Sequence, residues 1–288
     1  MPLPQALELG IQGALGVLQR TLRAEACEAR THRALLVRGW SDSAETVDAV
    51  AYYLLGLLAT AISRTLEIRS QLDDTARDRL ELLRNVERIT GTDEAPLTDD
   101  AIEDERNPWI AEGLWHLCLF LSSRRAELHP PGAVIALDLP HIAAKDHGLD
   151  VLAIYQSGAD GFGVSFVESK AYRNDPGGAV GAATAFFRQV DDGRHDARIR
   201  QVVATIRTGM SPALQTAISP SLWKDTRAYI PNPHFDNAVA MNWQRTRPAF
   251  ADLKVPRTQI VIMPNALPQF QDFFDSVAAS MRRHAAAL

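Results

Sequence analysis

Cysteine is almost absent from this 288-residue chain, and long apolar runs are missing. Cys27 and Cys118 are too few for a disulfide framework or a Cys-rich zinc site, so we expect a reducing, cytoplasmic setting. The most apolar stretch, 47–62, contains Asp48 and falls short of the roughly 20 residues of a membrane span. The first ten residues lack the basic start and apolar run of a signal peptide. We therefore expect no contact with a membrane.

No charge of one sign dominates the chain. Its 30 Lys and Arg residues stand against 35 Asp and Glu residues, a formal net charge of −5. A domain-wide positive field is thereby excluded, and any polyanionic partner must be held locally or through a bound cation. The chain also lacks a G-x-S-x-G nucleophile motif and a G-x-x-x-x-G-K-[ST] phosphate loop. If the system uses ATP, a partner must therefore supply that energy.

The pattern of the sequence changes near His129. Hydrophobic residues at 46% and charged residues at 23% predict a globular protein rather than a disordered one. Before His129 we expect only helices, with Ser43 and Asp74 as N-caps, and after it short β-like runs alternate with helices. The expected helices are 4–36, 43–72, 74–86, 107–125, 176–190 and a last one from 268; the expected strands are 133–139, 149–156, 162–170, 227–230 and 259–263.

One predicted hairpin gathers charged residues at its open end. If the SGADG segment forms the loop, Gln156 pairs with Phe162, and Asp150 then lies directly opposite Glu168. Because side chains alternate along a strand, Lys170 shares the face of both carboxylates. The rest of this face is apolar: Leu152, Ile154, Phe162, Val164 and Phe166.

A divalent cation would explain this grouping. Facing carboxylates at the end of a buried hairpin repel each other and lose solvation, and a bound metal removes that penalty. Asp150, Glu168 and the backbone carbonyl of Ser169, completed by water, suit Mg²⁺, for which Mn²⁺ is expected to substitute. Lys170 beside the metal would orient an attacking water or balance charge on phosphorus. The alternative interpretation is a charged hairpin end with a surface Glu–Lys pair of little energetic consequence.

Asp150, followed by an E-S-K triplet that ends in Lys170, resembles the PD-(D/E)XK nuclease superfamily, which has the restriction-endonuclease-like fold. The expected order of helix, three strands, helix and strand over about 107–264 is similar to that family's αβββαβ core. The resemblance implies metal-dependent hydrolysis of phosphodiester bonds, usually of DNA, with Asp150 and Glu168 as ligands and Lys170 as the catalytic lysine. Leu149 replaces the proline that often precedes the aspartate, at a loosely defined position.

Three further residues are candidates for this site. Glu112 and His116 are four residues apart and share one face of an otherwise apolar helix. If that face points to the metal end of the sheet, Glu112 adds a ligand and His116 an auxiliary group; if it does not, the two form a narrow solvent-facing stripe. Gln189 resembles a polar residue that related nucleases place near the site from the helix after the third strand, although a surface position is equally consistent with its surroundings.

We therefore expect an α/β protein with two parts. Residues 1–105 form an all-helical N-terminal region for recognition, oligomerisation or docking to a helicase or other motor or defence partner, and residues 106–288 form the nuclease-like domain. The expected substrate is DNA, with RNA as an alternative, and a homodimer would cut both strands of a duplex most easily. Restriction or anti-phage defence is the expected setting. The competing hypothesis is a non-catalytic nucleic-acid-binding or scaffold protein that retains the fold.

Overall fold

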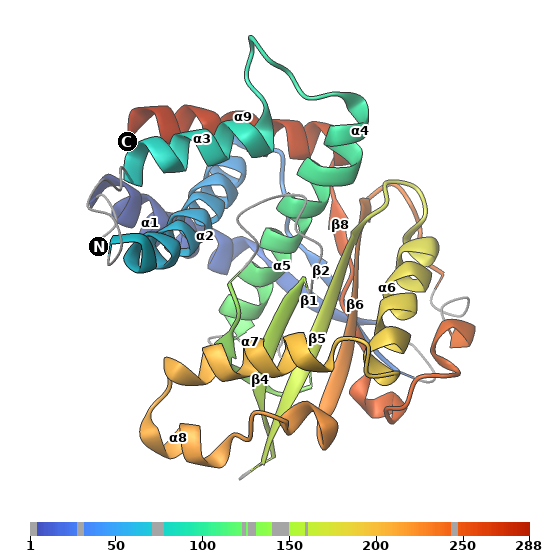
Figure 1. Cartoon of the computed structure of the whole chain (residues 1–288). Coiled ribbons are helices and arrows are strands. Elements are labelled where there is room, and N and C mark those ends of the chain that lie inside the picture. The colour runs from blue at the N-terminus through green and yellow to red at the C-terminus, as the bar shows by residue number, and fades with distance from the viewer. Residues whose placement is uncertain are drawn as a thin grey trace.

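The computed structural model describes residues 5–27, 32–70, 78–122, 125, 131–139, 150–158, 161–242 and 247–288. One mixed β-sheet runs through this part of the chain, with helices on both faces (Figure 1). This architecture confirms the expected α/β class. The sheet order is β1-β2-β8-β6-β5-β4-β3, with β7 also paired to β2. The strands are β1 Arg23–Cys27, β2 Arg33–Arg38, β3 Ala133–Leu137, β4 Val151–Ser157, β5 Gly161–Ala171, β6 Arg227–Asp236, β7 Val261–Ile262 and β8 Asn265–Leu267.

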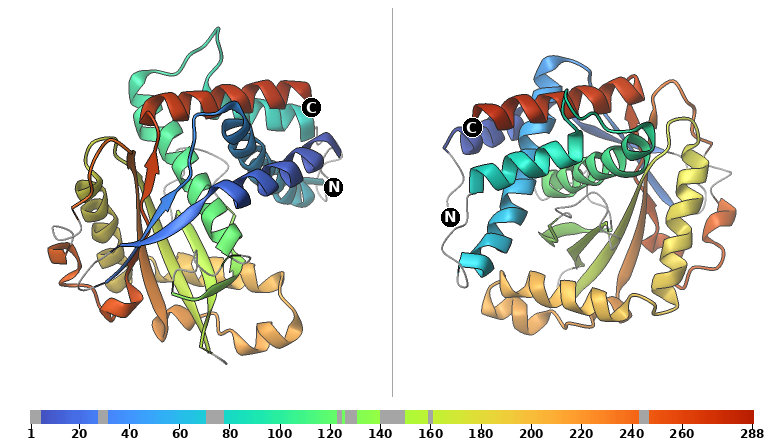
Figure 2. Two further views of the ribbon diagram at one scale, coloured as in Figure 1. Left: turned by 180° about the vertical axis from the view of Figure 1, so that it is seen from behind. Right: turned by 45° about the horizontal axis from the view of Figure 1, so that its top comes forward.

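Two helical layers cover the sheet (Figure 2). Helices α1, α2, α3, α5 and α9 share one hydrophobic cluster with one face, whereas α6 and α7 share a second cluster with the other. The α5 helix is buried on nearly all sides, as its almost uniformly apolar sequence requires. The helices are α1 Gln5–Thr21, α2 Ala44–Ser70, α3 Asp78–Thr90, α4 Asp99–Ala101, α5 Asn107–Ser122, α6 Pro176–Asp191, α7 Asp196–Thr208, α8 Pro212–Ala217 and α9 Phe270–Ala287. None of these described helices combines the length and apolarity that crossing a membrane requires.

The sheet has an antiparallel part and a parallel part. Strands β3, β4 and β5 form an antiparallel meander, in which Gln156 pairs with Phe162 as the sequence predicts. Strand β5 is parallel to β6, β6 to β8 and β8 to β2, and β1 closes this side as an antiparallel edge strand. The carboxyl ends of β5, β6, β8 and β2 therefore meet at one edge of the sheet.

The expectation of an all-helical N-terminal region is wrong for two segments. Residues 23–27 and 33–38, placed largely inside a helix over 4–36, are strands β1 and β2. The apolar run Leu35, Leu36 and Val37 is buried on both faces of the sheet, a pattern that short windows do not separate from a buried helix. Of the helix expected over 4–36, only the part that forms α1 is helical. The boundary at residue 105 falls inside one continuous sheet and one hydrophobic cluster.

Strand β6 is longer than the expected 227–230 because it tolerates two prolines. Proline cannot donate a ladder hydrogen bond and normally argues against a central strand. The carbonyl of Pro231 accepts from the Met263 amide at 3.1 Å, so residues 231 and 233 direct their backbone groups to the side of β7 and β8. Pairing with β8 begins only at His234, so the missing N–H groups fall where that ladder has not yet started.

The predicted helix starts are confirmed where the structure describes them. The Ser43 hydroxyl accepts from the Thr46 amide at 3.4 Å, one residue before α2 begins. The Asp175 carboxylate accepts from the Gly178 amide at 2.8 Å, and Pro176 occupies the first turn of α6. Asp74, the other expected N-cap, lies outside the described residues.

Candidate metal-dependent active site

Asp150, Glu168 and Lys170 meet at the end of the β4–β5 hairpin. Val151 and Val167 form the last described pair of this ladder, so Asp150 lies just beyond β4 and across from Glu168. The Lys170 Nζ is 2.6 Å from the Glu168 Oε1. The Asp150 Oδ2 accepts a hydrogen bond from the Ser169 amide at 2.8 Å. The structure thus brings the three predicted residues together.

Unequal strand lengths place Asp150 at this position. Strand β5 extends to Ala171, whereas β4 begins only at Val151, so the Ser169 amide has no partner residue on β4. A strand amide without a partner is costly, and the Asp150 carboxylate supplies the missing acceptor. Since the N–H and C=O of one residue leave a strand on the same side, the Ser169 carbonyl also points toward Asp150.

Burial makes the charges of this site costly. Glu168 is 6% exposed, and this burial, together with the nearby Asp150 charge, raises the pKa of Glu168 to about 8, although Lys170 opposes the shift. Burial by itself lowers the pKa of Lys170, but the Glu168 and Asp150 charges outweigh it and leave the pKa above its ordinary value. The second Glu168 oxygen, Oε2, is buried and has no hydrogen-bond partner among the described residues.

The unpartnered Glu168 Oε2 supports the donor set predicted for Mg²⁺. Buried carboxylate oxygens are normally bonded, and a hard cation would satisfy this one while neutralising two facing carboxylates. Asp150, Glu168 and the Ser169 carbonyl supply the oxygen ligands that Mg²⁺ prefers, with water for the remainder. Within the described ranges, no group of three or more His, Cys, Asp or Glu side chains is arranged to hold a metal ion. A metal here would therefore depend on the backbone oxygen and on water.

Glu112 and His116 lie on a buried face of α5. Their exposures are 6% and 5%, so the interpretation as a solvent-facing stripe is wrong. The His116 Nδ1 is 2.9 Å from the Tyr53 hydroxyl and its Nε2 is 3.0 Å from the Asp138 carbonyl oxygen. Both ring nitrogens are thus engaged, and burial lowers the pKa of His116 to about 4, so we assign it a structural rather than an auxiliary role.

Glu112 remains a candidate ligand. It lies one turn before His116 on α5, and His116 contacts the segment that follows β3. The Asp138 amide in that segment donates to the Leu152 carbonyl, at the same end of the sheet as Asp150. Glu112 is therefore near this end of the sheet, but α5 packs on the face that carries Val167, whereas Glu168 lies on the opposite face with Phe166. Its role as a ligand stays a prediction.

Gln189 does not lie at this site. It occupies the last turns of α6, where the neighbouring Asp191 accepts from the Tyr229 hydroxyl at 2.5 Å. Tyr229 pairs with Phe166, two residues before Glu168 on β5, so the end of α6 lies toward the opposite end of the sheet. The Gln189 Oε1 is instead 3.2 Å from the His195 Nε2.

A buried polar network beneath the site was not predicted. The Ser169 hydroxyl donates to the Asn232 Oδ1 at 3.0 Å, and the Asn232 amide donates to the Met263 carbonyl. Asn265 contacts Asn232 and His234, and its Oδ1 accepts from the Trp40 indole at 2.9 Å. This network ties the backbone around Ser169 to β6 and β8. Its only sequence signal is the alternation of Asn232 and His234, which the neighbouring prolines 231 and 233 hide.

Comparisons of the chain with protein-family models, with curated proteins and with solved structures found no match.

Proposed function

We propose that this protein is a Mg²⁺-dependent nuclease that hydrolyses phosphodiester bonds of DNA. The observation that carries the proposal is the meeting of Asp150, Glu168 and Lys170 at one strand end, with a buried Glu168 oxygen that lacks a partner. The order α5, β3, β4, β5, α6 and, after α7 and α8, β6, with β5 parallel to β6, supports a restriction-endonuclease-like αβββαβ core of the PD-(D/E)XK kind.

Each residue has a defined part in this proposal. Asp150, Glu168 and the Ser169 carbonyl would hold the cation, and Lys170 lies beside Glu168. The chemistry that a cation would supply there is a lower pKa of a bound water molecule and neutralisation of charge on phosphate oxygens. The Lys170 ammonium, which already donates to the Glu168 Oε1 at 2.6 Å, orients the attacking water and balances charge on phosphorus. The Ser169 amide keeps Asp150 aimed at the same point.

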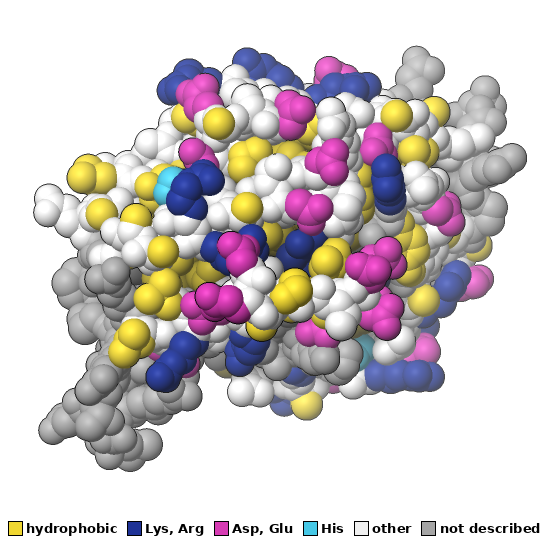
Figure 3. Space-filling view, turned by 90° about the horizontal axis from the view of Figure 1, so that it is seen from above, with side chains coloured by type: hydrophobic (Ala, Val, Ile, Leu, Met, Phe, Trp, Pro, Cys, Tyr) yellow, Lys and Arg dark blue, Asp and Glu magenta, His cyan; other side chains and the backbone are white. Residues whose placement is uncertain are grey.

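The surface charge supports local rather than global binding of a polyanion. Figure 3 shows Lys and Arg interspersed with Asp and Glu over the visible described face. Arg283 of α9 pairs with Asp48 of α2, so part of the basic charge is neutralised within the protein. A metal-bridged contact would supply attraction that this face does not. DNA duplex cleavage by two copies, and a helicase or other motor partner in a defence system, remain part of the proposal.

The deciding experiment is a cleavage assay. The full-length protein is incubated with plasmid, linear duplex, single-stranded DNA and RNA in Mg²⁺ or Mn²⁺, with EDTA as the metal-free control. Lys170→Ala is compared with Lys224→Ala, a surface lysine that pairs with Asp196. We expect metal-dependent cutting that Lys170→Ala abolishes and Lys224→Ala retains. Cutting by Lys170→Ala at the wild-type rate would refute the mechanism.

Calorimetry with Mn²⁺ separates the enzyme from a non-catalytic protein of the same fold. We expect binding by the wild-type protein and by Lys170→Ala, and loss of binding in Glu168→Ala and Asp150→Ala. If the wild-type protein neither cuts any substrate nor binds Mn²⁺, the non-catalytic alternative replaces our proposal.

A further inference from the structure

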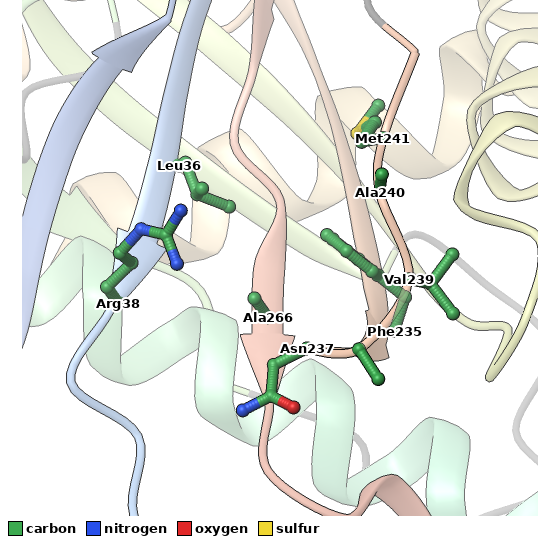
Figure 4. Close-up of a pocket in the computed structure, with 9 residues that line it drawn as sticks. Leu36, Arg38, Phe235, Asn237, Val239, Ala240, Met241 and Ala266 are labelled. Atoms are coloured by element: carbon green, nitrogen blue, oxygen red, sulfur yellow. The ribbon is translucent and has the colours of Figure 1, made fainter.

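A hollow of about 330 Å³ opens beside the proposed active site, at the carboxyl ends of the parallel strands (Figure 4). Its floor comes from three neighbouring strands: Leu36 of β2, Ala266 of β8 and Phe235 of β6. The segment after β6, which includes Val239 and Met241, forms one wall. This volume is at the lower end of the range typical of small-molecule pockets.

The hollow exists because a small residue stands between two large ones. Ala266 pairs with Phe235, and Arg38 follows Val37, which pairs with Asn265. Arg38, Ala266 and Phe235 therefore form one row across three strands, on one face of the sheet. The Ala266 methyl group leaves open the space that a larger side chain would fill.

The rim carries two polar groups of complementary kinds. Figure 4 shows the Arg38 guanidinium directed over the hollow, with the Asn237 amide on the side of β8 and β6. Arg38 uses its Nε to bind Glu25 at 2.7 Å, and its side chain is 52% exposed. A guanidinium group suits a phosphate, and an amide suits the hydrogen-bonding edge of a base. Apolar and aromatic floor residues suit the flat faces of a base.

The residues that line the hollow lie close to the proposed catalytic residues on the same face of the sheet. Lys170 pairs with Pro233, two residues before Phe235 on the same face of β6, so their Cα atoms are roughly 8 Å apart from strand spacing and rise alone. The next residue of β5 on this face is Tyr172, an aromatic side chain that is 41% exposed. Its amide donates to the His234 carbonyl at 3.0 Å, which places it beside Phe235.

We propose that this hollow binds a nucleotide, with its base on Phe235 and Ala266 and its phosphate on Arg38. If the protein is a nuclease, as proposed above, this nucleotide belongs to the bound DNA strand and lies next to the phosphate that is cut. In this respect the inference rests on the proposed function. A free nucleotide has the same chemistry, and the test distinguishes the two sources. Taking one base out of a stack into an apolar pocket is a known mode of recognition.

The test measures binding of thymidine monophosphate and of a fluorescent single-stranded oligothymidylate to the full-length protein in EDTA, where neither the metal nor cleavage contributes. Ala266→Leu fills the hollow and is compared with Ala213→Leu, the same change at an exposed position of α8. Arg38→Gln removes the phosphate ligand. Glu25→Gln removes the carboxylate that competes for Arg38.

We expect Ala266→Leu to weaken binding about tenfold, as loss of one stacked base does, and Ala213→Leu to leave it unchanged. Arg38→Gln should weaken binding, and Glu25→Gln should strengthen it. If these substitutions weaken binding of the oligonucleotide alone, the hollow binds a nucleotide of a DNA strand. If they weaken binding of thymidine monophosphate equally, the hollow binds a free nucleotide. Equal competition by inorganic phosphate, or unaltered binding of both ligands by Ala266→Leu, would overturn the inference. Because binding is measured without metal, failure of the nuclease proposal, seen as the absence of both cutting and Mn²⁺ binding in the wild-type protein, is a separate result.

Discussion

Replacing Glu168 by glutamine tests the energetics of the site before any activity is measured. The Glu168 side chain is buried, and burial together with the Asp150 charge raises its pKa from 4.5 to about 8 in the metal-free protein. Glutamine has nearly the same shape and carries no charge. The substitution therefore removes one ionisable group and leaves the packing of the side chain nearly unchanged.

The sign of the effect follows from proton binding. Between pH 4.5 and about 8 the folded protein holds a proton on Glu168 that the unfolded chain has released. The stabilisation from this group is complete below the ordinary pKa and is lost as the pH rises through the folded pKa. A shift of this size, in which the opposing effect of Lys170 is already included, corresponds to at most about 5 kcal/mol. We expect Glu168→Gln to be more stable than the wild-type protein above that pH by a few kcal/mol.

The assay is urea unfolding in EDTA across this pH range, with Glu87→Gln as a control at an exposed position. Histidines of the unfolded chain titrate in the same interval, whereas burial lowers the pKa of His116 in the folded protein to about 4. The informative quantity is therefore the difference in unfolding free energy between Glu168→Gln and the wild-type protein. We expect that difference to grow as the pH rises and the Glu87→Gln difference to stay flat. A Glu168→Gln difference that does not change with pH would refute the reasoning.

Mn²⁺ should reverse the order of stability. A metal that binds only the folded protein stabilises it by mass action, and binding requires the ionised carboxylate. At alkaline pH we therefore expect Mn²⁺ to stabilise the wild-type protein and not Glu168→Gln. Equal stabilisation of both proteins would place the metal elsewhere.

Three further substitutions test the role of His116 and the packing of the helical layer. His116→Ala should lower the unfolding free energy by about 2–3 kcal/mol, because it leaves the buried Tyr53 hydroxyl without its partner. We expect the folded variant still to cleave DNA. Loss of cleavage without loss of stability would instead assign His116 an auxiliary role in the reaction. Gly39→Ala should cost at least about 2 kcal/mol by thermal denaturation, since the backbone φ is +96° and a methyl group would overlap the Thr21 carbonyl. Asp48→Asn should cost about 1 kcal/mol, because this carboxylate joins α2 to three α9 side chains; an unchanged urea midpoint would contradict that estimate.

The hairpin was predictable because its information is local. Alternation of apolar residues identifies the two strands, and the loop sets their register, so the position of Asp150 opposite Glu168 follows from counting. The same reasoning places Lys170 on the shared face. Neither step requires knowledge of what lies on the other side of the sheet.

Other parts depend on contacts between distant segments, which the sequence does not display. Strand β2 is a strand because β7 and β8, more than 200 residues later, pair with it. Strand β6 keeps its two prolines because of where β8 begins. Gln189 was placed near the site by its spacing from Lys170, but a helix of this length carries it away along the sheet.

The dependence on distant segments reaches the proposed metal ligands themselves. The Ser169 carbonyl and the Asp150 carboxylate are set by the end of β5, which is anchored through Ser169 to Asn232 of β6. Asn232 contacts Asn265 of β8, and Asn265 is held by the Trp40 indole, two residues after β2. An N-terminal segment that the sequence suggests is an accessory region is thus the far end of the network that supports the site. The proposed metal ligands belong to a folded unit that includes residues 33–40, because one sheet and one hydrophobic cluster extend across the boundary expected at residue 105.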